Sequence, residues 1–175
     1  MPPESASKDV DPELVDVIDE NDVVVGRVTR AEMRRQVLRH RAVFAAVVSS
    51  EGKLLIHRRS DTKDIWPGWW DIAVGGVVTA GETYDSAMVR ELAEEVGIDD
   101  AVCRPLGKGA YADPVVSLIG QCFLVGHDGP VDARDGEVAE FCWVSVRELR
   151  ERLERDRFLP DSCALMLPGL FDHLR

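Results

Sequence analysis

The sequence predicts an α/β protein in which strands and helices combine in one sandwich. Short apolar runs bounded by turn residues are typical of strands, and capping-box patterns mark where helices begin. The chain has 175 residues, 45% of them hydrophobic and 30% charged, which suffices for one ordinary globular domain. We expect a disordered polar tail over residues 1–10 and a single domain over residues 11–175.

The N-terminal part of that domain predicts a β-hairpin followed by a short helix. Strands over residues 14–18 and 23–28 are separated by a turn-forming E-N-D sequence. Thr29, with Glu32 three residues later, fits a capping box. We therefore expect a helix that reaches Leu38.

The middle of the chain predicts a second hairpin, a loop and a further strand. Apolar runs over residues 41–49 and 54–58 flank the sequence SSEGK, which is typical of a hairpin turn. A loop over residues 60–70 leads to one strand over residues 71–78. More strands are expected over residues 102–109, 115–125 and 141–144.

The helix expected over residues 83–96 carries an acidic face. The segment contains no proline or glycine, and Gly97 follows where a helix would end. At about 100° per residue, one face is apolar and consists of Val89, Leu92, Ala93 and Val96. Glu91, Glu94 and Glu95 converge on the opposite face, in the last turn, where they repel each other and where the helix dipole favours cations. Either this face is solvated, or a hard divalent cation with oxygen ligands lies between the acids.

Two helices are expected in the C-terminal part. Ser145 with Glu148 fits a second capping box, for a helix that ends near Arg155. The last helix should be capped by Asp161 or Ser162 and interrupted or ended by Pro168-Gly169.

The acidic residues belong to a longer pattern, G-x5-E-x7-R-E-L-x-E-E-x-G-I, over residues 76–98. Its nine defined positions are Gly76, Glu82, Arg90, Glu91, Leu92, Glu94, Glu95, Gly97 and Ile98. A pattern of this length seldom matches by chance. The segment resembles the Nudix box, which implies a mixed β-sheet sandwiched between helices, here with an N-terminal β-hairpin. Nudix proteins mostly hydrolyse diphosphate linkages in nucleoside diphosphates attached to another group, using Mg2+ or Mn2+.

The resemblance implies roles for the acidic residues. Glu91 and Glu95 would hold metal, and Glu94 would be a further metal ligand and catalytic residue. Either Glu91 or a glutamate of a later loop would accept the proton from water. For that later residue, Glu137 is better placed than Glu140, since both lie just before a strand in the sequence GEVAEFCW.

Three residues in or next to the box are expected to assist the metal ligands. The backbone carbonyl of Gly75 would contribute to the metal site, as the residue before the box does in relatives. Glu82 is expected to pair with Arg90 and to orient a metal ligand from behind. A plain structural salt bridge is the alternative for that pair.

Upstream of the box, the sequences LRHRAVF and LLIHRRSDTKDIWPGWWDIAVGG resemble isopentenyl-diphosphate isomerase, a Nudix relative that is not a hydrolase. The shared pattern consists of His40, Arg59-x3-Lys63 and Trp66-Pro67-Gly68. Arg59 and Lys63 are candidates for binding phosphate, because Arg forms bidentate oxygen contacts and Lys offers a mobile charge. The alternative is a solvated basic strand end. Arg58 should point to the opposite face of its strand.

Two other features leave alternatives open. His40 matches an isomerase metal ligand, but a lone histidine is more often a structural residue. Trp66, Trp69 and Trp70 could stack on a base or pack in the core.

The isomerase places a cysteine and a histidine on either side of the first box glycine, to transfer protons. This chain has Gly75 and Val77 there, and neither side chain can move a proton. We therefore predict a metal-dependent pyrophosphohydrolase acting on a nucleoside-diphosphate-type small molecule. The alternatives are an isomerase-like enzyme and a non-catalytic ligand-sensing domain.

The composition of the chain limits which binding partners and which cellular location we expect. A net charge of −11 argues against binding of long nucleic acid. No apolar run approaches the roughly 20 residues of a membrane span, and no secretory signal begins the chain. The four cysteines form no CxxC pair and are expected to be reduced, so we predict a cytoplasmic protein. A homodimer is one alternative for its oligomeric state.

Overall fold

Strand β3 (His40–Val48) is the centre of the fold in the computed structural model, which describes residues 12–175. Every residue from Ala42 to Val48 is buried, because both faces of this strand are covered. Strand β3 pairs with β1, β4 and β6 in antiparallel fashion and with β8 in parallel fashion. The sheet is therefore mixed, as predicted. The tail expected over residues 1–10 lies outside the described residues.

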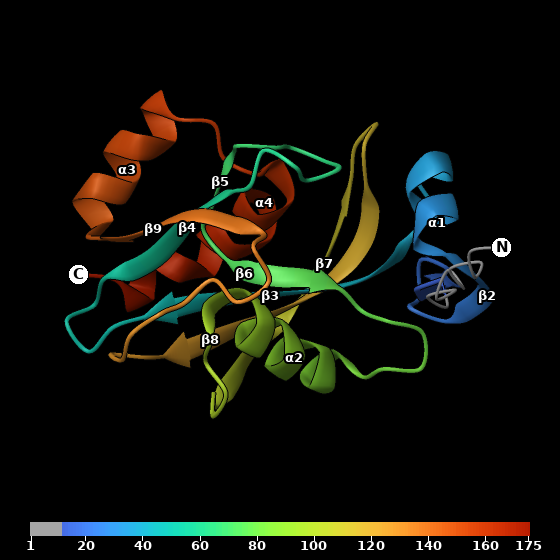
Figure 1. Ribbon diagram of the computed structural model, residues 1–175, viewed down its shortest axis with the longest axis horizontal. Coiled ribbons are helices and arrows are strands. Elements are labelled where there is room, and N and C mark those ends of the chain that lie inside the picture. The colour runs from blue at the N-terminus through green and yellow to red at the C-terminus, as the bar shows by residue number, and fades with distance from the viewer. Residues whose placement is uncertain (1–11) are drawn as a thin grey trace, which may run out of the picture.

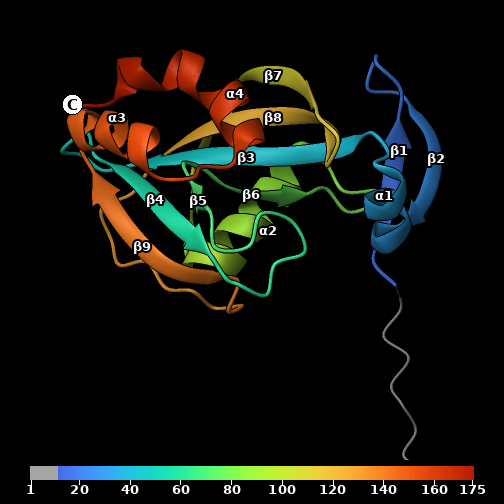
Figure 2. The same ribbon diagram turned by 90° about the horizontal axis from the view of Figure 1, so that it is seen from above.

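Within residues 12–175, nine strands form one sheet, and helices cover both of its faces (Figures 1 and 2). The other strands are β1 (Leu14–Ile18), β2 (Val24–Thr29), β4 (Leu54–Arg59), β5 (Trp70–Asp71), β6 (Val74–Val77), β7 (Cys103–Ala112), β8 (Ser117–Gly126) and β9 (Val138–Val144). The helices are α1 (Arg30–Gln36), α2 (Tyr84–Val96), α3 (Val146–Arg155) and α4 (Pro160–Leu170), followed by the 3-10 turn η1 (Phe171–His173). None of the helices from residue 12 onward is long and apolar enough to cross a membrane.

The alternating side chains of β3 contribute to two hydrophobic clusters, one on each face of the sheet. Val43 packs in the cluster that α2 covers, and Phe44 packs in the cluster that α4 covers. On the α4 face, Leu165 lies over Gly109 and Gly120, which are partners in the β7–β8 ladder. A Cβ atom at either glycine would come within 2.6 Å of another side chain, so these two positions allow the close approach of α4.

The N-terminal hairpin and α1 form a separate unit at one end of the sheet (Figure 2). Asp22, in the left-handed backbone region at φ 64°, anchors this unit. Its carboxylate accepts hydrogen bonds from Arg41 at 2.5 Å, Lys108 at 2.8 Å and Tyr84 at 3.0 Å. The hairpin turn is thereby tied to three other elements.

The segment expected to be one strand over residues 71–78 is instead two short strands. Strand β5 pairs with β4, and β6 pairs with β3. The chain bends between them, where the carboxylate of Asp71 accepts a hydrogen bond from the backbone N–H of Ala73 at 3.0 Å. The hairpin expected from residues 41–58 is also partial. Strands β3 and β4 pair only beside the turn and then separate toward different partners.

The apolar face predicted for the helix over residues 83–96 is partly wrong. Val89 is 43% exposed, whereas Glu91 and Glu95 are buried toward the sheet, together with Met88 and Leu92. The predicted acidic face therefore does not point to solvent as a whole. Hydrophobic periodicity alone could not show this, because two of the buried positions are carboxylates.

Of the three predicted helix N-termini at α1, α3 and α4, two differ from expectation. Ser145 forms the full capping box of α3. Thr29 accepts from the N–H of Glu32 at 3.1 Å, but the Glu32 carboxylate binds Arg35 and Gln36 instead of closing the box. Helix α4 begins at Pro160, earlier than the predicted caps, because proline suits the first helical position. It also continues through Pro168, which lies in the last turn.

Candidate functional site

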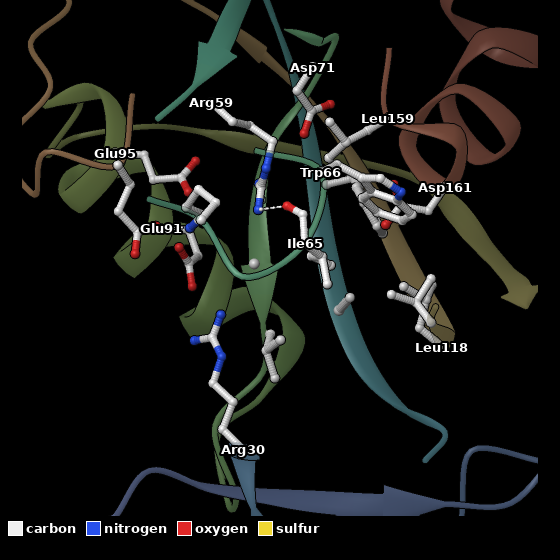
Figure 3. Close-up of a pocket in the computed structure, with 18 of the residues that line it drawn as sticks. Arg30, Arg59, Ile65, Trp66, Asp71, Glu91, Glu95, Leu118, Leu159 and Asp161 are labelled. Atoms are coloured by element: carbon white, nitrogen blue, oxygen red, sulfur yellow. Dashed lines mark hydrogen bonds and ion pairs between the residues drawn. The ribbon is translucent and has the colours of Figure 1, made fainter. Parts of the chain in front are cut away.

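A cavity of about 450 Å3 opens between α1, α2, β3, the end of β4 and the start of α4 (Figure 3). Three groups of side chains make up most of its lining. One acidic group consists of Glu91, Glu94, Glu95, Asp135 and Glu137, while Glu13, Asp71 and Asp161 line other parts of the wall. The basic group consists of Arg30, Arg34, Arg59, Lys63 and Arg90. The apolar group consists of Phe44, Ile65, Trp66, Val116, Leu118 and Leu159.

Glu91 and Glu95 are one turn apart on α2 and only 8% and 4% exposed. Burial raises the pKa of Glu91 to about 7, against the opposing effect of Arg90. Burial also raises the pKa of Glu95, and the charge of Glu91 adds to the effect. One carboxylate oxygen of Glu95 is buried and has no hydrogen-bond partner in the part of the chain that the structure describes. A buried carboxylate without a partner is costly, so this position suits a bound cation.

Glu95 is joined by two acids of the loop before β9. Carboxylate oxygens of Glu95, Asp135 and Glu137 all lie within 4.8 Å of one another. The loop turns at Gly136, which has φ of 74°, and Asp135 accepts from the N–H of Glu137 at 2.9 Å. Only oxygen atoms are offered, which is the donor set that Mg2+ prefers. Asp135 was missed from the sequence, where nothing but its proximity to Glu137 singles it out.

Arg90 connects the other acids of the box. It donates two hydrogen bonds of 2.9 Å to Glu82, one of 2.7 Å to Glu91 and one of 3.3 Å to Glu94. The hydrogen bonds from Arg90 lower the pKa of Glu82. The expected pair of Glu82 and Arg90 is therefore present, and Arg90 also touches Glu91. Glu94, with its side chain 52% exposed, lies at the rim of the cavity.

Two consecutive glycines of β6 face α2 and β3. A Cβ atom on Gly76 would lie 2.3 Å from a carboxylate oxygen of Glu91. A Cβ atom on Gly75 would lie 2.0 Å from the backbone oxygen of Val43. Gly76 thus leaves the space that the Glu91 carboxylate fills. The place of Gly75 also has no room for the cysteine that an isomerase would need, while its carbonyl as a metal ligand stays a prediction.

Arg59 and Lys63 both line the cavity, as their assignment to phosphate requires. Arg59 donates to the backbone oxygen of Ile65 at 3.1 Å, has no ion pair within residues 12–175, and keeps a buried Nε without a hydrogen bond. Lys63 pairs with Glu137. Arg58 instead pairs with Glu140 at 3.4 Å, and neither of these two lines the cavity.

The apolar group surrounds a compartment beside Arg59. Trp66 lines it with a backbone φ of 46°, a strained conformation for a tryptophan. Asp161 also lines the cavity, is 6% exposed and accepts from the N–H of Ser162 at 2.8 Å. Burial raises the pKa of Asp161 to about 7, and the charge of Asp71 adds to this. Figure 3 shows Glu91 and Glu95 on one side of Arg59, and Trp66 and Asp161 on the other.

The remaining aromatic and histidine candidates have structural contacts. Trp70 lies under the guanidinium of Arg152 at 3.9 Å and packs against the core, and Trp69 packs near Trp66 with ring centroids 6.4 Å apart. His40 is 1% exposed, and its Nδ1 lies 2.9 Å from the backbone oxygen of Leu38. Burial lowers the pKa of His40 to about 4, so the ring is neutral at neutral pH. These contacts favour the structural alternative for His40.

The cavity therefore combines buried carboxylates with the guanidinium of Arg59, which has no ion pair in the part of the chain that the structure describes. The family model of the NUDIX domain matches residues 38–162. The chain therefore belongs to the Nudix family and is a hydrolase acting on phosphoanhydride bonds.

Known proteins agree with this assignment. The chain is 37% identical over 150 residues to the uncharacterized Nudix hydrolase YfcD of Escherichia coli K12, a match that covers 86% of this chain and 82% of YfcD. It is 40% identical over 153 residues to the Nudix hydrolase SCO1686 of Streptomyces coelicolor, covering 86% and 84%. The crystal structure of DR0079 from Deinococcus radiodurans is similar with a TM-score of 0.77 and 28% identity, covering 93% of this chain and 100% of DR0079. The resemblance to the isomerase gains no support from these proteins.

Proposed function

We propose that the chain is a metal-dependent pyrophosphohydrolase that cleaves a diphosphate linkage in a nucleoside-diphosphate-type small molecule. The observation that carries this proposal is the placement of Glu95. One oxygen of its carboxylate is buried without a hydrogen-bond partner among residues 12–175, and a carboxylate oxygen of Glu95 lies within 4.8 Å of oxygens of Asp135 and Glu137. The same cavity holds the guanidinium of Arg59, which has no ion pair within the described residues.

The cofactor we propose is Mg2+, with Mn2+ as the alternative. Glu91, Glu95 and Glu137 would hold it, assisted by Asp135, while Glu94 and the Gly75 carbonyl are further candidates from the sequence. When bound, such an ion neutralises phosphate oxygens and lowers the pKa of the attacking water. The all-oxygen donor set and the raised pKa values of Glu91 and Glu95 support a cation at this position.

The side chains around the ion would share the remaining work. Arg59 and Lys63 would bind the diphosphate oxygens and stabilise the charge that develops on them. Glu91 would accept the proton of the attacking water, with Glu137 as the alternative acceptor. Arg90 would hold the carboxylate of Glu91 in place, since Arg90 donates a hydrogen bond of 2.7 Å to that carboxylate. Arg90 is itself held by its hydrogen bond to Glu82.

The apolar compartment would take the organic group beyond the diphosphate. Trp66 offers a ring for stacking, and Phe44 and Leu118 close the walls. Asp161 would accept hydrogen bonds from N–H or O–H groups of the ligand. A nucleoside fits these requirements, because its flat base can stack on Trp66 and its N–H and O–H groups can donate hydrogen bonds to Asp161.

The test is turnover of purified protein against nucleoside triphosphates, dinucleoside polyphosphates, nucleotide sugars, coenzyme A and isopentenyl diphosphate. With Mg2+, at least one compound should be cleaved at a diphosphate linkage. Excess chelator should abolish turnover while circular dichroism stays unchanged, because the carboxylates can relax into the open cavity. Turnover that survives in excess chelator would refute metal dependence.

A pair of variants on α2 controls for damage to the helix. Glu95→Gln removes the buried carboxylate and should lower kcat/KM by at least about a hundredfold, roughly 2.7 kcal/mol. Asp85→Asn changes an exposed acid on the same helix and should leave kcat/KM unchanged. Cytoplasmic location and a homodimer stay predictions from the sequence.

A further inference from the structure

Helix α1 brings two arginines to the cavity from outside the segment that matches the family model. The match begins at residue 38, whereas α1 covers Arg30–Gln36. Arg30 and Arg34 are one turn apart, so they share a side of the helix, and both line the cavity. Arg30 points up into the cavity toward Glu91 in Figure 3. Arg35, on another side of α1, is 71% exposed and pairs with Glu32.

The N-terminal unit holds these arginines at a fixed position relative to the Nudix box. The N–H of Ala80 donates to the backbone oxygen of Leu14 at 2.8 Å, and the N–H of Gly81 donates to Asp16 at 3.1 Å. Met33 of α1 packs against Val15 and against Val77 of β6 in a small buried cluster. The unit is therefore attached both to β6 and to the loop that leads into α2.

The charges of the two arginines add to that of Arg59. The side chain of Arg34 is 18% exposed, and its buried Nε contacts a carboxylate oxygen of Asp64 at 3.3 Å without forming a hydrogen bond among residues 12–175. Burial lowers the pKa of Arg34, and although Asp64 opposes this, Arg30 and Arg59 lower it further. Like charges thus converge on one cavity of a protein whose net charge is −11. Carboxylates offset part of this repulsion, and an anion between the cations would offset it as well.

The carboxylates that now pair with these arginines are partly exposed. Arg30 pairs with Glu13 at 3.1 Å, and Arg34 pairs with Asp64 at 3.3 Å. The side chains of Glu13 and Asp64 are 40% and 51% exposed. The arginine side chains are 35% and 18% exposed, so solvent screens these ion pairs only in part, and a ligand would have to compete with the carboxylates for the arginines.

We infer that Arg30 and Arg34 form a second anion subsite, which binds a terminal phosphate group that the substrate carries beyond the cleaved diphosphate. The inference rests on the proposed function, in which Arg59 and Lys63 bind the diphosphate itself. Guanidinium groups suit a terminal phosphate because they offer paired donors to two of its oxygens. This group can be the anhydride-linked terminal phosphate of a nucleoside triphosphate or a phosphate ester on a ribose hydroxyl.

Calorimetric titration of the protein in excess chelator tests the subsite without turnover. Two pairs of compounds differ by one phosphate: adenosine 3′,5′-bisphosphate against AMP, and ATP against ADP. Comparison within a pair cancels the contributions that both compounds share. The wild-type protein should bind the more phosphorylated member of at least one pair about tenfold more tightly. The pair that shows the preference identifies the source of the terminal phosphate.

Matched variants on α1 assign the preference to these side chains. The double variant Arg30→Gln/Arg34→Gln should lose the preference, whereas Arg35→Gln should keep it. A wild-type protein without preference in either pair, or a double variant that keeps the preference, would overturn the inference. Failure of all hydrolysis would refute the proposed function but leave this binding result standing.

A second double variant keeps the test decisive where the first does not fold. Glu13→Gln/Asp64→Asn retains both arginines and removes the carboxylates that compete for them. The preference for the more phosphorylated compound should then rise above that of the wild type. An unchanged or smaller preference would count against the subsite.

Discussion

Individual side chains with unmet hydrogen-bonding capacity concentrate at the cavity. Four buried side-chain atoms of residues 12–175 have no hydrogen-bond partner: Arg34 Nε, His57 Nδ1, Arg59 Nε and Glu95 Oε2. Three of these belong to residues that line the cavity, and His57 does not. Of the three, Arg34 Nε has an ion-pair contact with Asp64 at 3.3 Å. Buried polar groups are normally satisfied, so their grouping is explained best by a ligand that would complete them.

Arg59 and its neighbour Arg58 offer a direct comparison at this scale. Arg59→Ala should lower kcat/KM by at least about tenfold, or ~1.4 kcal/mol, because both phosphate binding and transition-state stabilisation lose a cation. Lys63→Ala should act in the same direction. Arg58→Ala should leave kcat/KM unchanged, since Arg58 pairs with Glu140 away from the cavity. Steady-state kinetics decides, and unchanged values in both the Arg59 and Lys63 variants would assign these residues to a solvated surface.

Asp161 gives a stability prediction whose sign depends on pH. Its pKa is raised from an ordinary value of 3.8 to about 7, so between these values the folded protein binds a proton that the unfolded chain releases. This group therefore destabilises the fold progressively as the pH rises from about 4 to 7. Asp161→Asn removes the ionisation and should stabilise the protein more at pH 8 than at pH 5.5, by a difference of about 2 kcal/mol. Urea unfolding at both pH values measures it, and an equal effect at the two would contradict the raised pKa.

At the scale of elements, the contacts of β6 with β3 and α2 explain why two glycines adjoin at the start of the box. Gly75 faces the backbone of β3, which cannot move without breaking the sheet. Gly76 faces the flexible end of the Glu91 side chain. Two neighbouring positions thus serve different purposes.

Alanine at each position should separate these purposes. Gly75→Ala should destabilise the fold by about 1–3 kcal/mol, because its Cβ would overlap the carbonyl of Val43. Gly76→Ala should change stability by less than about 1 kcal/mol but lower kcat/KM at least about tenfold, because it displaces the Glu91 carboxylate. Thermal unfolding and kinetics on both variants provide the measurement. A Gly76→Ala enzyme with full activity would exclude Glu91 from catalysis in its present position.

Local patterns in the sequence predicted most elements but not their tertiary partners. The box, its helix and the N-terminal hairpin follow from short-range signals such as caps, turns and apolar runs. The break between β5 and β6 was missed because each short strand is defined by a different neighbour, β4 or β3. The burial of Glu91 and Glu95 was missed for a similar reason: periodicity assigns carboxylates to the solvent face.

For the whole molecule, the cavity is built from residues as distant in sequence as Glu13 and Asp161. Arg59, Lys63 and Glu137 were predicted from the sequence because a motif or a family pattern marks them, and all three line the cavity, while their roles stay predictions. No motif or family pattern includes Arg30, Arg34 or Asp135. Asp161 was predicted only as a possible helix cap. Only the folded chain brings these residues to the acids of the box, so their participation could not be deduced from spacing.

The whole site also decides between hydrolysis and isomerisation. An isoprenoid diphosphate could still be bound through Arg59, Lys63 and a metal ion. Isomerisation additionally requires a proton to be delivered to one face of the alkene and removed elsewhere, and the side chains at positions 75 and 77 supply neither step. Val77 is buried against Val15 and Met33, and the place of Gly75 is closed by Val43.

Diphosphate hydrolysis needs only an activated water and neutralised phosphate charge, which the acids and cations of the cavity can provide. The wild-type protein with Mg2+ should therefore release phosphate, pyrophosphate or a nucleoside monophosphate from at least one diphosphate compound. It should not interconvert isopentenyl and dimethylallyl diphosphates, which chromatography of the incubated compounds can detect. Interconversion far above the uncatalysed background would overturn this conclusion, whatever hydrolysis accompanied it, because a proton donor and acceptor would then have to exist outside positions 75 and 77.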